Sequence, residues 1–374
     1  MNFRGKLHIL DLSGGPLERG RQHGEALRRE IREHQTHWME SISEALGAPA
    51  GNYLDYMVET CGFLDRAERE TPDLVEELHG IAQGADLSFA RVFARMLSDE
   101  EPWFRMEYRD GCAASGKGCS AIGSDRGAEG PTIIAQTMDV PTWWDGGQTL
   151  LRFTQPNGDR ALVFTVAGKI SLCGMTARGL AITCNSLLQL DHCRNGLAED
   201  LVVRSYLASG SVSAGYVFMH QADHASGQNY VLPDGTGRAV SLECSARSVR
   251  EWRRAKDDVA VAHTNHPVAS SDTDWYDAQV RNLTRAQVEE RFGFTSVGRL
   301  ETLHARMEMD RPLTVATAKE ILACREGPIC RVGEVEGKRD GFTFGSLVME
   351  LSDAPVLHLA PGPADRTEWQ MFAA

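Results

Sequence analysis

The sequence predicts an α+β protein in which helices and sheets form separate layers. Residues 16–98 carry apolar side chains at helical spacing, whereas short apolar runs bounded by turn residues begin at Cys119. Helices then return in blocks, at 198–223 and at 276–291 together with 314–324, instead of alternating singly with strands. This order is typical of layered α+β folds and not of βαβ repeats.

The region before Cys119 is predicted to be one short strand followed by helices. Met1–Leu12 alternates apolar and polar residues, as a strand does. Thr71-Pro72-Asp73 is a helix-start signal, and a further helix is expected over 88–98. Residues 109–118 are glycine-rich and break the composition, as an exposed, processed loop would.

The region from Cys119 onward is predicted to form most of the strands. The segments expected to be strands are 119–124, 132–138, 149–155, 161–167, 180–184, 229–232, 238–243, 259–263, 342–351 and 356–359. We therefore divide the chain into a mainly helical segment, 1–118, and a segment of sheets and helices, 119–374, which together form one intertwined globular unit.

Composition excludes several classes of function. A net charge of −13 disfavours nucleic acid and anionic membranes as partners, and no apolar run is as long as the ~20 residues that a bilayer span needs. The nine cysteines are scattered, odd in number and without a C-x-x-C pair, which suits reduced thiols and predicts a cytoplasmic protein without a metal site.

Gly118-Cys119 is the most informative dipeptide. Cys119 opens an apolar run that a glycine-rich turn joins to a second run ending at Asp139, so a hairpin would make Cys119 and Asp139 neighbours. A glycine before the cysteine leaves room for the thiolate to reach the preceding carbonyl. Cleavage of Gly118-Cys119 would give Cys119 an α-amino group, with a pKa of about 8, that can serve as base for its own thiol.

Other residues compete with this interpretation. Cys112 follows Asp110-Gly111, but a turn-like sequence comes after it instead of a strand. Gly111–Lys117 fits the spacing of a phosphate-binding loop, yet Gly118 stands where that loop needs Ser or Thr. A thiol-dependent hydrolase that does not cleave itself, with His263 as the base for Cys119 or Cys112, also stays open.

Several motifs, taken in order, resemble a known family. They are Arg19-Gly20-Arg21-Gln22-His23-Gly24, Glu76–Ala82, Gly118-Cys119-Ser120, Ala135-Gln136-Thr137-Met138-Asp139, Gly179–Leu187, Leu242-Glu243-Cys244-Ser245, His263-Thr264-Asn265-His266, Ile329-Cys330-Arg331 and Thr343-Phe344-Gly345. Together they resemble the cysteine N-terminal nucleophile hydrolases of the penicillin acyltransferase type (acyl-CoA:6-aminopenicillanate, or isopenicillin N, acyltransferase), whose bacterial relatives include carcinine hydrolase-like amidases. The resemblance implies an αββα four-layer sandwich with an N-terminal helical segment.

The resemblance also implies roles for single residues. Cys119 would be the nucleophile of both self-cleavage and catalysis, and Asp139 would orient its α-amine. Asn265 would donate to the oxyanion with a second donor from the backbone near Asn185, and Ser245 and Arg331 would lie close to the site. Val140, Trp143 and Trp144 are expected in the substrate pocket.

The activity implied is that of an autoproteolytic amidohydrolase acting on a small N-acyl amide through a Cys119 thioester. A CoA-dependent N-acyltransferase and an unprocessed binding protein of the same fold are the alternatives. No metal or organic cofactor is required, although acyl-CoA would be the co-substrate of an acyltransferase. The expected partners are a small-molecule amide or acyl donor and the cleaved N-terminal fragment, and the sequence leaves a homo-oligomer open.

Overall fold

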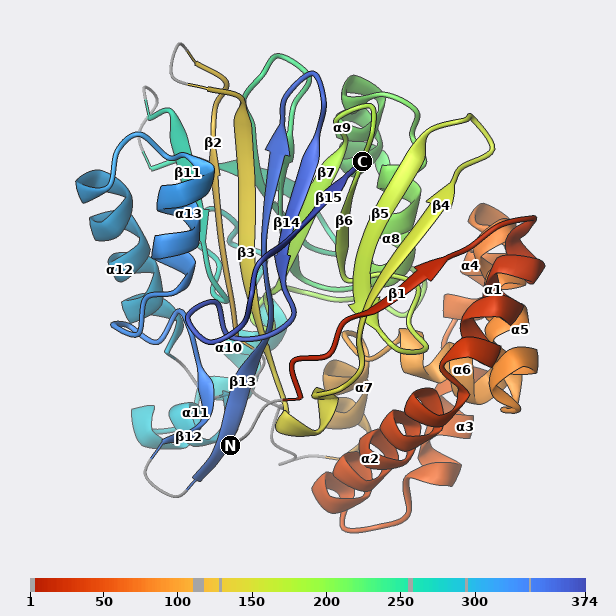
Figure 1. Ribbon diagram of the computed structural model, residues 1–374. Helices are drawn as coiled ribbons and strands as arrows, with labels where there is room; N and C mark the ends of the chain where they lie inside the picture. The colour runs from red at the N-terminus through yellow and green to blue at the C-terminus, as the bar shows by residue number, and fades with distance from the viewer. Residues whose placement is uncertain (1–3, 110–117, 128–129, 255–257, 293–294, 336–337) are drawn as a thin grey trace.

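The computed structural model describes residues 4–109, 118–127, 130–254, 258–292, 295–335 and 338–374. Two packed β-sheets form the centre of the molecule, and helices cover the outer face of each (Figure 1). The predicted α+β class with an αββα layer order is therefore confirmed.

The eight-stranded sheet has the order β1-β4-β5-β6-β7-β8-β9-β10. Its strands are β1 (His8–Asp11), β4 (Gln148–Thr154), β5 (Arg160–Val166), β6 (Cys173–Thr176), β7 (Ala181–Ser186), β8 (Gln228–Pro233), β9 (Ala239–Cys244) and β10 (Val249–Trp252). All neighbours are antiparallel except β1, which pairs with β4 in parallel. The N-terminal segment thus supplies an edge strand to this sheet.

The seven-stranded sheet carries the predicted hairpin. It has the order β11-β2-β3-β13-β14-β15, with β12 paired to β13. Its strands are β2 (Gly118–Ser124), β3 (Thr132–Val140), β11 (Ala260–His263), β12 (Val332–Val335), β13 (Lys338–Leu351), β14 (Val356–Ala360) and β15 (Gln370–Ala373). Every residue of β2 and β3 is buried, because one face of the hairpin meets the other sheet and the second face meets helices.

The helices divide between the two outer faces. The helices that pack on the eight-stranded sheet are α1 (Pro16–Ala26), α2 (Arg28–Leu46), α3 (Ala50–Thr60), α4 (Phe63–Glu70), α5 (Pro72–Ala85), α6 (Phe89–Met96), α8 (Glu199–Leu207) and α9 (Val212–Gln221). The short α7 (Glu101–Tyr108) follows α6 and precedes β2, and Trp143 and Trp144 lie in a 3-10 turn, η1 (Thr142–Trp144).

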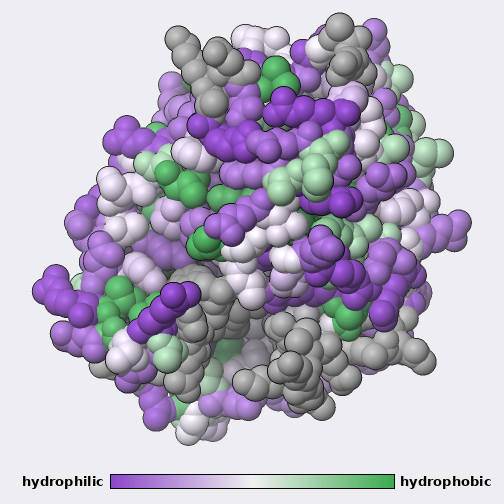
Figure 2. Space-filling view, turned by 90° about the vertical axis from the view of Figure 1, so that its left-hand side faces the viewer, coloured by the Kyte–Doolittle hydropathy of each residue, from purple (hydrophilic) through white to green (hydrophobic). Residues whose placement is uncertain are grey.

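The other outer face is covered by α12 (Ser296–Met309) and α13 (Val315–Leu322), and α10 (Asp274–Val280) and α11 (Arg285–Phe292) precede them in the chain. Apolar residues of α12 and α13 pack on Ile122, Ile133 and Ala262 of the sheet. Figure 2 shows that this side of the molecule is mostly hydrophilic, with small separate apolar patches. No helix among the described residues is long and apolar enough to cross a bilayer.

The structure contains several helices and strands that the sequence did not predict. The predicted helix over 198–223 is two helices, α8 and α9, because Gly210 adopts a positive φ of 79° between them. β6 and β10 have only four residues each, too few for a clear alternation. The helix α12 was also missed, and it carries a residue of the candidate site.

Candidate active site

Cys119 lies at the start of β2, where the hairpin brings it beside the end of β3. Gly118 pairs with Asp139, and Cys119 pairs with Met138. Side chains alternate along a strand, so Cys119 shares a face with Ala121, and both contribute to the apolar cluster between the two sheets. The hairpin therefore makes Cys119 and Asp139 neighbours, as the sequence required.

Gly118 allows an unusually close approach of Asp139. A Cβ atom on residue 118 would lie only 2.9 Å from Asp139 Oδ2 and 3.3 Å from its Cβ. A residue with a side chain would therefore push the carboxylate away from the Gly118-Cys119 bond. This is a steric reason for glycine on the upstream side of the predicted scissile bond.

Asp139 is held by two partners from the C-terminal part of the chain. The Thr343 hydroxyl donates to Asp139 Oδ1 at 2.7 Å, and the Arg331 guanidinium forms an ion pair with Oδ2 at 3.1 Å. Thr343 Oγ1 also accepts from the Arg331 amide at 2.9 Å. Asp139 is 1 % exposed, so these contacts compensate a buried negative charge.

Asn265 contacts the backbone of Cys119 directly. Its Oδ1 accepts from the Cys119 amide at 2.6 Å, and its Nδ2 donates to the Ser186 carbonyl at 3.0 Å. Donors surround Oδ1 and an acceptor faces Nδ2, so the hydrogen-bond network fixes the orientation of the side chain. Asn265 thus links the start of β2 to the end of β7 across the two sheets.

Arg299, on α12, is a site residue that sequence reasoning missed. Its guanidinium donates to the Cys119 carbonyl, to Ser120 Oγ at 3.0 Å and to Asn265 Oδ1 at 2.7 Å. Burial lowers the pKa of Arg299 to about 10, and the nearby charge of Asp139 opposes that shift. A pKa of about 10 still keeps the group positive at neutral pH. The helical spacing of Leu300, Leu303 and Met307 was the sequence signal for this helix.

Asn185 is fully buried on β7, one residue before the carbonyl that Asn265 holds. Its Oδ1 accepts from Asn229 Nδ2 at 3.3 Å, and its own Nδ2 has no hydrogen-bond partner among the described residues. The Asn185 side chain therefore offers a buried donor at this place, whereas the expected second donor was a backbone group near Asn185.

Ser245 contacts a different part of the chain. Its hydroxyl donates to Asp272 Oδ2 at 2.6 Å and accepts from the amides of Arg247 and Ser248 at 3.0 Å each. These contacts shape the turn after β9 and tie it to Asp272. Its predicted role close to the nucleophile stays a prediction, and the hydrogen bonds described here are those of a turn.

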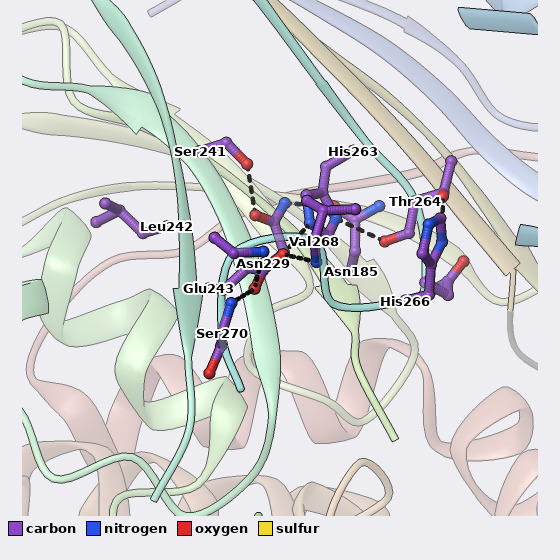
Figure 3. Close-up of polar contacts among 12 residues, drawn as sticks. Asn185, Asn229, Ser241, Leu242, Glu243, His263, Thr264, His266, Val268 and Ser270 are labelled. Atoms are coloured by element: carbon purple, nitrogen blue, oxygen red, sulfur yellow. Dashed lines mark hydrogen bonds and ion pairs between the residues drawn. The ribbon is translucent and has the colours of Figure 1, made fainter. Parts of the chain in front are cut away.

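The histidines near Asn265 are bound to other groups (Figure 3). His263 contacts Glu243 Oε1 through Nε2 at 2.8 Å and the Thr264 carbonyl through Nδ1 at 2.9 Å. His266 Nδ1 lies 2.7 Å from Ser296 Oγ, and burial lowers the pKa of His266 to about 4. Both ring nitrogens of His263 are occupied, so this arrangement gives no support to His263 as the base for a cysteine.

Apolar and thiol groups surround Cys119 on the inter-sheet side. Val140 and Trp144 belong to the same buried cluster as Cys119, with Trp143 packed against it. Burial raises the pKa of Cys173 and Cys184 well above the ordinary thiol value, with a smaller contribution from Glu199. These two neighbours of the nucleophile candidate are therefore neutral thiols at physiological pH.

Cys112, the competing nucleophile, lies outside the described residues, and so does the segment Gly111–Lys117 that fits the spacing of a phosphate-binding loop.

A groove of about 840 Å³ opens beside Ser124, between the far end of β2 and the α12–α13 connection. Five residues of strand separate Ser124 from Cys119, or about 17 Å. This groove is therefore distinct from the Cys119 site. Among the described residues no group of His, Cys, Asp or Glu is arranged to hold a metal ion.

Sequence comparisons match the chain to a protein family and to a fungal relative. The model of the family "Acyl-coenzyme A:6-aminopenicillanic acid acyl-transferase" matches residues 127–346, a range that contains Asp139, Asn265 and Arg331 but begins after Cys119. The 40 kDa form of acyl-coenzyme A:6-aminopenicillanic-acid-acyltransferase from Emericella nidulans is 26 % identical over 264 residues, covering 70 % of this chain and 69 % of that protein.

Two solved structures align with part of the chain. A mutant of the conjugated bile acid hydrolase from Clostridium perfringens aligns with a TM-score of 0.46 at 13 % identity, over 67 % of this chain and 96 % of that one. Penicillin V acylase from Agrobacterium tumefaciens aligns with a TM-score of 0.43 at 13 % identity, over 68 % of this chain and 86 % of that one. Since the family model covers more than half of the sequence, the chain belongs to the acyl-coenzyme A:6-aminopenicillanic acid acyl-transferase family.

Proposed function

We propose that this protein is a self-processing cysteine amidohydrolase that cleaves its own Gly118-Cys119 bond and then hydrolyses a small N-acyl amide. The observation that carries the proposal is the 2.6 Å hydrogen bond from the Cys119 amide to Asn265 Oδ1, beside the buried Asp139. The nitrogen that would become the new α-amine is thus already held in place before cleavage.

The maturation step needs no group from outside the chain except water. Cys119 Sγ attacks the Gly118 carbonyl, the C–N bond breaks, and the α-nitrogen takes up a proton as the acyl group moves to sulfur. Water then hydrolyses the thioester, giving the Gly118 carboxylate and the free Cys119 thiol. In the product, Asp139 and Asn265 would hold the α-amine between them.

In catalysis the Cys119 thiolate attacks the substrate carbonyl, and its α-amine accepts the thiol proton and passes it to the leaving amine. Asn265 Nδ2 and a donor near Asn185 would stabilise the oxyanion. Arg331 pairs with Asp139 at 3.1 Å, and Val140, Trp143 and Trp144 would line the acyl side. Water releases the acyl group from the thioester and regenerates the enzyme.

The cleaved N-terminal segment is expected to stay bound. β1 pairs with β4 beyond the cleavage point, and Glu77 forms a buried ion pair with Arg204 at 2.8 Å. Lys169 is fully buried and donates to Ser98 Oγ at 2.8 Å. The mature enzyme would therefore be a non-covalent pair of fragments, and its scattered cysteines without a C-x-x-C pair suit a cytoplasmic location.

Acyl transfer is the second candidate, favoured by the family to which the chain belongs. The same thioester would then pass its acyl group to an amine, and acyl-CoA would be the donor. The two reactions differ in the acyl donor and in whether water or an amine attacks the thioester. Supplying an acyl-CoA and an amine to the mature enzyme, and comparing amide formation with CoA release, decides between them.

The proposed function is tested on the purified full-length protein. We expect intact mass spectrometry to give two fragments, and Edman sequencing to read Cys119 as the new N-terminus. Quenching turnover of an N-acyl amide should add one acyl mass to the Cys119 fragment. An intact chain after prolonged incubation, or an N-terminus at Cys112, would overturn the assignment.

Replacing Asn265 separates its two roles. Asn265→Ala removes both the acceptor for the Cys119 amide and the Nδ2 donor, so cleavage and kcat should each fall by about 10²–10³-fold. Asn265→Asp keeps an acceptor at Oδ1 but has no amide donor, so it should retain more of the self-cleavage than of the kcat. Single-turnover rates of both steps check this, and equal losses for Asp and Ala would argue against the donor role.

A further inference from the structure

Glu243 is a buried carboxylate that the proposed mechanism does not use. It lies on β9, is 0 % exposed, and accepts hydrogen bonds from His263 at 2.8 Å and from the amides of Val268 at 2.6 Å, Ala269 at 3.0 Å and Ser270 at 2.6 Å (Figure 3). Burial opposes ionisation, but these bonds outweigh it and lower the pKa of Glu243 below its ordinary value.

His263 is the side-chain partner of Glu243. Its Nε2 lies 2.8 Å from Glu243 Oε1, and its Nδ1 lies 2.9 Å from the Thr264 carbonyl oxygen. Neither side chain has any exposed surface, so the contact between Glu243 and His263 is shielded from water.

The pair fixes both ends of the segment that carries Asn265. His263 immediately precedes Thr264-Asn265, and the three amides bound by Glu243 follow within five residues. Between these anchors, Ser296 Oγ accepts from the Asn265 amide at 2.7 Å. Two sets of contacts therefore position Asn265 against the Cys119 amide: those of Glu243 with the turn that follows Asn265, and that of Ser296, on α12, with the Asn265 amide.

We infer that Glu243, acting with His263, is a positioning residue that holds Asn265 at the reactive end of β2. This inference rests on the proposed function, in which Asn265 serves first the Cys119 amide and later the oxyanion. A buried carboxylate that binds three consecutive amides defines the path of that turn much more tightly than side-chain packing does. A displacement of about 1 Å at such a residue typically costs on the order of 10²-fold in rate.

A matched control exists in the helical layer. Glu77 is also buried and paired, to Arg204 at 2.8 Å and to Arg19 at 3.4 Å, but it contacts helices and not the Asn265 turn. Glu77→Gln and Glu243→Gln each remove one buried carboxylate charge. Both should lower the melting temperature, so stability alone does not separate a positioning role from a structural one.

The test measures hydrogen exchange at residue 119 in a chain that cannot cleave itself. In a C119A background, Glu243→Gln should speed exchange in the peptide containing residue 119 by about tenfold or more, because the amide loses its fixed acceptor. Glu77→Gln should leave that peptide unchanged. In the Cys119 protein, Glu243→Gln should lower kcat by about 10²-fold with little change in KM, and Glu243→Asp should recover part of the loss.

The inference is overturned if Glu243→Gln and Glu77→Gln lower the melting temperature alike while exchange at residue 119 stays at the parent rate. If Glu243→Gln does not fold, Glu243→Asp carries the same comparison with a smaller expected effect. Absence of cleavage and turnover in the parent protein would sink the proposed function instead. The exchange comparison does not depend on activity and would still decide the positioning role.

Discussion

Cys119→Ala should yield a single uncleaved chain with no turnover of amides. The substitution removes the atom that we propose attacks Gly118 and, in the mature enzyme, the substrate. Loss of the nucleophile of a serine protease costs on the order of 10⁶-fold in kcat, and a comparable loss is expected for Cys119. Cys119→Ser keeps a weaker nucleophile at the same place, so slow cleavage with a much lower kcat is expected.

Two cysteine variants serve as controls for this result. Cys184→Ala removes a thiol of the same neighbourhood whose pKa is raised by burial, and it should cleave and turn over within a few-fold of the parent. Cys112→Ala removes the rival and should also cleave. Fragment masses and initial rates give the comparison. Loss of cleavage in Cys112→Ala, with cleavage kept in Cys119→Ala, would move the nucleophile to residue 112.

Local sequence was enough to predict the hairpin that joins β2 to β3. The apolar runs that became β2 and β3, and the turn between them, fix the register that pairs Gly118 with Asp139. That prediction needed only residues close in sequence. The layered α+β class also followed from the order of helical and strand patterns, whereas the αββα layer order was implied by the family resemblance.

Long-range polar contacts could not be predicted in the same way. Arg299 bonds to the backbone of a residue 180 positions earlier, and Glu243 binds amides of a turn that packs against it only in the folded sheet. An arginine on a helix is usually solvent-exposed, so the burial of Arg299 can be recognised only once α12 is seen to pack against β2. Asn265 was expected mainly as a donor, and the structure shows that its oxygen is engaged as well.

Arg299→Met should reduce self-cleavage and kcat by about 10²–10³-fold, a loss as large as that expected of Asn265→Ala. The guanidinium supplies donors to three oxygen atoms around the predicted scissile bond: the Cys119 carbonyl, Ser120 Oγ and Asn265 Oδ1. Methionine fills a similar volume without donors, so those acceptors lose their partners. Asn265 would then be held at Oδ1 by the Cys119 amide alone.

Arg299→Lys distinguishes geometry from charge. Lysine keeps the positive charge near Asp139 but presents a single ammonium, which cannot reproduce the fork that bonds β2 and Asn265 at once. If the fork positions the site, Lys should resemble Met in cleavage rate and in kcat. If charge alone matters, Lys should restore most of both rates.

Arg204→Met is the matched control, since it removes a buried arginine paired with Glu77 in the helical layer. It should lower the melting temperature while the folded protein still cleaves, and a cleavage defect as large as that of Arg299→Met would assign the Arg299 effect to folding.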